Sequence, residues 1–65
     1  SKELVELIFT QPYCKIQFLL EAGIAKRQTA SEYLKELENI GILTAEKQGR
    51  EVLYKHPALL AVLAA

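Results

Sequence analysis

The sequence predicts a mainly α-helical domain with a small β-hairpin, arranged as a winged helix-turn-helix. Two glycine–isoleucine pairs, Gly23-Ile24 and Gly41-Ile42, mark the ends of two successive helices. A glycine takes the left-handed conformation of a helix end without steric cost, and the apolar residue that follows packs back on the helix. After the second pair the helical spacing of apolar residues stops, and Gln48-Gly49 separates two short runs that favour strands. Two helices joined by a tight turn and followed by a hairpin indicate this fold.

The first two helices are expected in residues 2–9 and 13–22. Apolar residues recur in both at the spacing of one helix face. They are Leu4, Leu7 and Ile8 in the first helix and Ile16, Leu19 and Leu20 in the second. Pro12 cannot continue the first helix but suits the first position of the next one. Cys14 lies among apolar neighbours without a catalytic partner, so we expect a buried, inert thiol.

The third helix is expected in residues 26–40. Its apolar residues fall on one face, and they are Ala30, Tyr33, Leu34, Leu37 and Ile40. The small side chain of Ala30 suits a close crossing of two helices near a tight turn. The opposite face is polar, so this helix is expected to present that face outward.

The hairpin is expected to have a loop longer than two residues. A two-residue loop at Gln48-Gly49 would place Lys47 opposite Arg50 and Glu46 opposite Glu51, and like charges in these positions are unfavourable. A three-residue loop would pair Glu46 with Arg50, or Lys47 with Glu51, and so removes the conflict.

A last helix is expected after His56-Pro57, through residues 58–65. It is almost wholly apolar, so it must lie either on the core or on a partner. His56 is expected to cap this helix or to lie at the surface, because no catalytic partner is recognisable in the sequence.

Length and composition limit the classes of function. The 65 residues predict one domain, and the absence of methionine leads us to expect that residues 1–65 are part of a longer protein. A single cysteine allows no internal disulfide, and no Cys/His set indicates zinc. The apolar runs are too short to span a bilayer and no signal peptide is visible, so we expect a cytoplasmic setting without a membrane partner. No P-loop or catalytic pair of carboxylates is present, so we expect no catalytic, metal or cofactor site.

Two kinds of partner remain open. The first hypothesis is a protein partner, because 51% of the residues are hydrophobic, a high share for so small a domain. The surplus lies chiefly in the first and last helices, where Leu4, Leu60 and Leu63 are the candidate interface residues. They would pack on a parent catalytic domain or on a second copy of the chain.

The alternative is double-stranded DNA. In helix-turn-helix proteins the second helix of the motif enters the major groove with its N-terminal residues against the bases. The candidate contacts are Lys26, Arg27, Gln28, Thr29, Ser31 and Lys35 on the helix and Lys47 and Arg50 on the hairpin. A formal net charge of zero argues against a dedicated nucleic-acid binder, and Glu32 lies one turn from these residues. Bases gathered on one side would favour DNA, whereas bases alternating with acids would favour a protein.

Nearly the whole chain resembles the C-terminal winged-helix segment of Fic-family proteins, which transfer AMP from ATP to a hydroxyl group of a target protein. The resemblance lies in Gln11-Pro12-Tyr13-Cys14, in AGIAKRQTAS at residues 22–31, in residues 33–37 and 40–43, and in Gly49-Arg50-Glu51 with His56-Pro57. The catalytic histidine of that family, with its Gly-Asn-Gly-Arg loop, is absent from these residues, as is the inhibitory helix. The resemblance therefore implies an accessory domain that selects partners or binds DNA, with ATP and magnesium used only by the parent catalytic domain.

Overall fold

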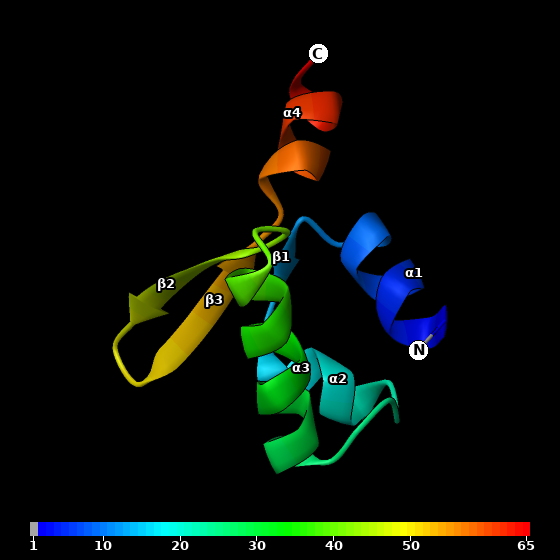
Figure 1. The fold of residues 1–65 in the computed structure, drawn as a ribbon, viewed down its shortest axis with the longest axis vertical. Coiled ribbons are helices and arrows are strands. Elements are labelled where there is room, and N and C mark those ends of the chain that lie inside the picture. Colours follow the sequence, from blue (N-terminus) through cyan, green and yellow to red (C-terminus); the bar gives the residue numbers. More distant parts are fainter. Residues whose placement is uncertain (1) are drawn as a thin grey trace.

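Four helices and three strands lie within residues 2–65, the part of the chain that this computed structural model describes (Figure 1). In chain order the elements are α1 (Lys2–Thr10), β1 (Tyr13–Cys14), α2 (Ile16–Glu21), α3 (Arg27–Asn39), β2 (Thr44–Gln48), β3 (Glu51–Lys55) and α4 (Pro57–Ala64). The three strands form one antiparallel sheet in the order β1-β3-β2. The mainly α-helical winged helix-turn-helix is therefore confirmed.

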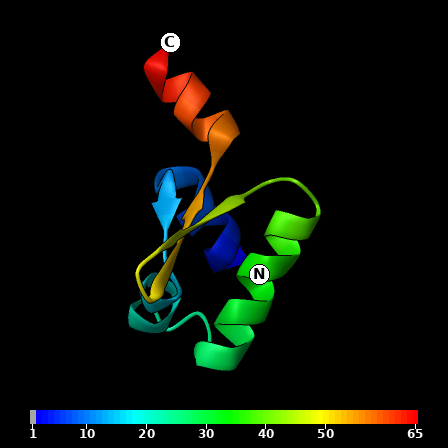
Figure 2. The ribbon, with the colours of Figure 1, turned by 90° about the vertical axis from the view of Figure 1, so that its left-hand side faces the viewer.

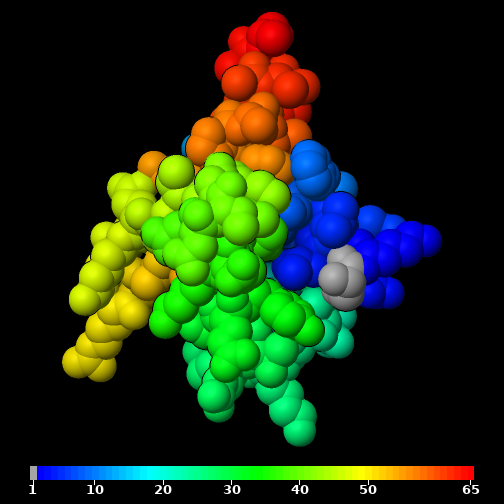
Figure 3. All heavy atoms as spheres, viewed as in Figure 1, coloured from blue at the N-terminus to red at the C-terminus, as the bar shows by residue number. Residues whose placement is uncertain are grey.

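The elements lie around α3. Figure 1 shows α2 and α3 at one end of the molecule, the β2–β3 hairpin on one side and α1 on the other. In Figure 2, turned by 90°, α4 again extends from the opposite end, away from the helix-turn-helix. The space-filling view shows α4 as a protrusion beyond the rest of the surface (Figure 3). The fold thus has a helix-turn-helix end and an α4 end.

The glycine–isoleucine pairs close both helices of the motif. At Gly23-Ile24 the glycine has φ +70°, and the isoleucine N–H donates to the carbonyl of Leu19 at 3.0 Å. At Gly41-Ile42 the glycine has φ +88°, and the isoleucine N–H donates to the carbonyl of Leu37 at 3.0 Å. Bonds that reach back five residues in this way satisfy carbonyls that a helix end would otherwise leave open. Both predicted helix ends are confirmed.

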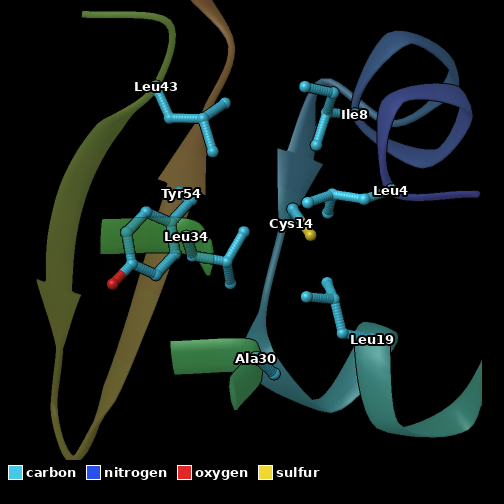
Figure 4. Packing of buried hydrophobic residues seen from close by; sticks show 8 residues of the cluster. All are labelled: Leu4, Ile8, Cys14, Leu19, Ala30, Leu34, Leu43 and Tyr54. Carbon is cyan, nitrogen blue, oxygen red and sulfur yellow. The ribbon is translucent and has the colours of Figure 1, made fainter. Parts of the chain in front are cut away.

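The core lies between α3, α1, α2 and the sheet. Its buried hydrophobic residues are Leu4, Ile8, Cys14, Leu19, Ala30, Leu34, Leu43 and Tyr54. Figure 4 shows these side chains converging, with Leu34 and Ala30 of α3 facing Leu19 of α2. Within residues 2–65 every buried side-chain nitrogen and oxygen atom has a hydrogen-bond partner. Among these residues, the core therefore contains no buried polar side-chain atom that lacks a hydrogen bond.

The second helix is shorter than the sequence indicates. Tyr13 and Cys14, expected in a helix, form β1 instead and pair with Lys55 and Tyr54 of β3. The carbonyl of Pro12 also accepts a hydrogen bond from the backbone N–H of the residue that follows β3, at 2.9 Å. The helical prediction for residues 13–15 was wrong because pairing with a distant strand outweighs the local periodicity.

The hairpin register also differs from the expectation. Gln48 pairs with Glu51, so the loop consists of Gly49 and Arg50 and is shorter than predicted. Gly49 has φ +64°, whereas Arg50 has no positive φ, a pattern that matches the type II′ turn favoured in two-residue hairpins. Lys47 and its neighbour Glu46 then face Val52 and Leu53. This register avoids the like-charge pairs without a longer loop.

Gly23→Ala should lower the free energy of unfolding by about 1 kcal/mol, because a left-handed φ is costly for any residue with a Cβ atom. A methyl group at Gly23 would meet no atom within 4 Å, so the loss measures backbone strain alone. Gly23→Asn is the matched control and should lose less, because asparagine tolerates this conformation better. Urea denaturation measures both variants, and equal stability of Gly23→Ala and the unchanged chain would contradict the cap.

Cys14 should resist alkylation in the folded chain. Its side chain is 1% exposed, which confirms the predicted burial, and this burial raises the pKa of the thiol from its ordinary value of 9.0 to about 11. At pH 9 iodoacetamide should therefore modify the folded chain far more slowly than the urea-unfolded chain, as measured by mass spectrometry. Equal alkylation rates would contradict the burial.

The raised pKa of this thiol also affects stability. Because the folded-state pKa is the higher one, the thiol makes the free energy of unfolding fall as the pH rises from 9 towards 11.

Candidate functional site

The start of α3 presents the polar residues expected at a DNA interface. Lys26 lies at the N-cap position, and Arg27 and Gln28 follow it, all three exposed. Thr29 and Ser31 are half-buried. The helix is continuous and its first residues are open to solvent. Whether they contact DNA stays a prediction.

The remaining candidate residues of that hypothesis lie on α3 and on the hairpin. Lys35 is exposed farther along α3, and Lys47 is exposed on β2. Arg50 is exposed in the two-residue turn of the hairpin. The fold brings only part of this set together, since Arg27 and Arg50 line one surface pocket.

We call this feature the cationic pocket. It has a volume of about 200 Å³ and is lined by Lys15, Ile16, Gln17, Arg27, Arg50, Glu51 and Val52. Its wall comes from three places in the chain, namely the start of α2, the start of α3 and the tip of the hairpin. Lys15 was not among the predicted residues, because the sequence placed it inside a helix rather than before one.

Ion pairing separates the basic residues into two groups. Three lysines are paired: Lys2 with Glu6 at 4.0 Å, Lys15 with Glu51 at 2.9 Å, and Lys55 with Glu46. In the described part of the chain the other five bases form no ion pair, and these are Lys26, Arg27, Lys35, Lys47 and Arg50. All five belong to the predicted DNA-contact set. The fold therefore leaves uncompensated positive charge at the start of α3 and along the hairpin.

Acidic residues interrupt this charge farther along α3. Glu32, Glu36 and Glu38 are all exposed on this helix. Burial raises the pKa of the Tyr54 phenol, and the nearby carboxylate of Glu38 raises it further. Bases gathered on one side would favour DNA, and this criterion is met only in part. Basic residues gather at the start of α3 and at the hairpin tip, whereas basic and acidic residues alternate along the rest of the helix.

The opposite end of the molecule is anchored by His56. The sequence places this residue at the surface or in a cap. It does occupy the N-cap position of α4, but it is only 2% exposed and its ring makes no capping bond. Its Nδ1–H donates to the carbonyl oxygen of Ile8 at 2.7 Å, and its ring meets the edge of Phe9 at 4.8 Å between centroids. The base of α4 is therefore fixed to α1.

Beyond that anchor α4 leaves the core. In residues 57–64 no side chain is buried, and Leu59 and Leu60 are only half-buried. Val62 and Leu63 are 70% and 64% exposed. The sequence leads us to expect this helix on the core or on a partner, and within residues 2–65 it is not buried on the core.

Further exposed apolar residues lie at the end of the molecule from which α4 extends. Phe9 lies in the last turn of α1 and Ile40 caps α3, and they are 55% and 60% exposed. In both ribbon views the C-terminal ends of α1 and α3 lie on the side from which α4 extends (Figures 1 and 2). Leu4, also expected at an interface, is 7% exposed within the core, because it faces inward from α1. That part of the interface prediction was wrong.

Residues 2–65 contain neither a membrane-spanning helix nor a metal-binding cluster. No helix among them is long and apolar enough to cross a membrane. No group of three or more histidine, cysteine, aspartate or glutamate side chains among them could hold a metal ion.

His56→Ala should lower the free energy of unfolding by about 1–3 kcal/mol, because it leaves a buried carbonyl oxygen of Ile8 without its donor. The control is Val62→Ala, which is exposed on the adjoining helix and should change stability by less than about 0.5 kcal/mol. Urea denaturation compares the two variants. A His56→Ala chain as stable as the control would show that the ring does not anchor α4.

A known protein family matches most of the chain. A family described as "Protein adenylyltransferase SoFic-like, C-terminal domain" matches residues 1–59. The match covers α1, the whole helix-turn-helix, the hairpin and the beginning of α4. The exposed Val62 and Leu63 lie just beyond it.

Proposed function

The chain belongs to the family of C-terminal domains of SoFic-like protein adenylyltransferases, and from this premise we propose that it is a non-catalytic accessory domain. It docks through α4 on the catalytic portion of its own adenylyltransferase. AMP transfer, with ATP and magnesium, takes place in that catalytic portion. The accessory domain positions itself there and helps to select the protein that is modified.

The exposure of α4 carries this proposal. The helix PALLAVLA has no charged side chain and no buried one. A helix that is hydrophobic on all sides is normally buried in a larger body. Full burial of Val62 or Leu63 would contribute about 1.5–3 kcal/mol for each side chain. A partner surface is therefore the energetically expected place for α4.

The catalytic portion of the same protein is the occupant that fits best. The family description assigns this domain to the C-terminal part of an adenylyltransferase, so the two parts would be joined in one chain. Such a connection raises the effective concentration of one part near the other to about the millimolar range when the linker is short. An interface with few anchor residues then suffices, which suits a helix of eight residues.

Val62→Asp and Leu63→Asp should each weaken the binding of the 65-residue chain to a separately produced catalytic portion by about tenfold or more, because each places a charge in an apolar contact. Isothermal titration calorimetry measures this binding. Tyr33→Ser is the matched control, since Tyr33 is exposed on α3, and it should bind as the unchanged chain does.

Two results would contradict the docking. The first is no detectable binding of the unchanged chain to the catalytic portion. The second is a stable dimer of the chain in analytical ultracentrifugation that the α4 variants dissolve, because a second copy would then cover the helix.

A further inference from the structure

The cationic pocket plays no part in the docking of α4 and lies at the other end of the molecule. The start of α2, the start of α3 and the hairpin turn enclose about 200 Å³ there. Since one water takes about 30 Å³, this space holds a phosphate group with several bound waters. Five of its seven lining residues are charged or polar, and three of these are basic, so the pocket favours an anionic ligand.

Its charges suit a phosphate. Arg27 and Arg50 reach the pocket from α3 and from the hairpin, and neither forms an ion pair with any residue in the range 2–65. A guanidinium presents a planar fork of donors that matches phosphate oxygens. The side chain of Lys15 adds a third cation and is 35% exposed. These residues are far apart in the sequence, so the fold alone brings them together.

The backbone at the start of α3 adds to this field. No side chain caps the helix, because Lys26 makes no capping hydrogen bond. The N–H groups of the first turn are therefore left without a capping acceptor, and they carry the positive end of the helix dipole. An anion beside Arg27 would lie against this end of a thirteen-residue helix.

We propose that the cationic pocket binds a backbone phosphate of duplex DNA. The unpaired bases extend beyond the pocket, to Lys26 beside Arg27 and to Lys47 on β2. A single phosphate on a peptide would engage the pocket alone, whereas the repeated phosphates of a duplex also reach these neighbours. Glu32, Glu36 and Glu38 flank Lys35 along the rest of α3, so the contact lies at the start of the helix and is made to the DNA backbone rather than to the bases.

Glu51 opposes this binding. Its carboxylate lies in the wall of the pocket and pairs with Lys15 at 2.9 Å. The carboxylate offsets the charge of Lys15, so the three cations leave the pocket with a net charge of +2. Glu51 therefore limits the affinity, and its removal should free Lys15 for the ligand.

The first test is fluorescence anisotropy of a labelled duplex of about 20 base pairs, titrated with the 65-residue chain at low salt. Arg27→Ala combined with Arg50→Ala should weaken binding about tenfold or more. It should also reduce the log–log salt slope by about 0.9 for each lost phosphate contact. Lys2→Ala is the matched control, because Lys2 is an exposed base on α1 outside the pocket, and it should bind as the unchanged chain does.

The second variant separates binding from folding. Glu51→Gln keeps the shape of an exposed side chain and should tighten duplex binding about threefold, a gain that a destabilised chain would not show. Duplex affinity that is unchanged in both the arginine double variant and Glu51→Gln would overturn the proposal. A phosphoserine peptide or inorganic phosphate that displaces the duplex at equal phosphate concentration would overturn the assignment to DNA. Val62→Asp leaves this binding intact, so the result stands apart from the docking of α4.

Discussion

The packing of α3 against α2 is the constraint on which the rest of the structure depends. Leu19, Ala30 and Leu34 have no exposed surface, and the small side chain of Ala30 allows the two helices to approach closely near their turn (Figure 4). Because this contact fixes the rotation of α3, it determines which residues face outward. Arg27 faces the hairpin turn as a consequence, and the acidic residues are distributed along the remaining exposed surface.

What the sequence could predict were the features set by local rules. The glycine–isoleucine pairs gave both helix ends, because a left-handed glycine and the hydrogen bonds behind it involve only a few consecutive residues. Apolar periodicity likewise placed both ends of α1 and α3 to within one residue. Non-local pairing was not accessible in this way. Strand β1 forms because Cys14 meets Tyr54, forty residues away in the chain, and the hairpin register follows from a turn at Gly49 rather than from charge alone.

The candidate site was predictable to a similar extent. The basic residues at the start of α3 and on the hairpin were identified from the fold class, and the structure shows that they are the bases without ion pairs. Lys15 could not be found, because its position depends on where α2 begins. The net charge of zero does not reveal which basic residues are unpaired, because ion-paired and unpaired bases contribute equally to the sum. The sequence showed an excess of apolar residues, but it did not show that Leu4 is buried in the core rather than exposed.

The hydrogen bonds of His56 determine the direction in which α4 leaves the rest of the molecule. Its backbone N–H is bonded to the carbonyl of Pro12 and its ring to that of Ile8, so α4 leaves the body in one direction rather than through a loose joint. The longest dimension of the domain is 34 Å, several times the Debye length of about 8 Å at physiological ionic strength. The positive charge near the hairpin turn is therefore largely screened by salt at the far end of the molecule, where α4 lies. A phosphate at the hairpin end and a partner on α4, as proposed above, would therefore have little electrostatic influence on each other.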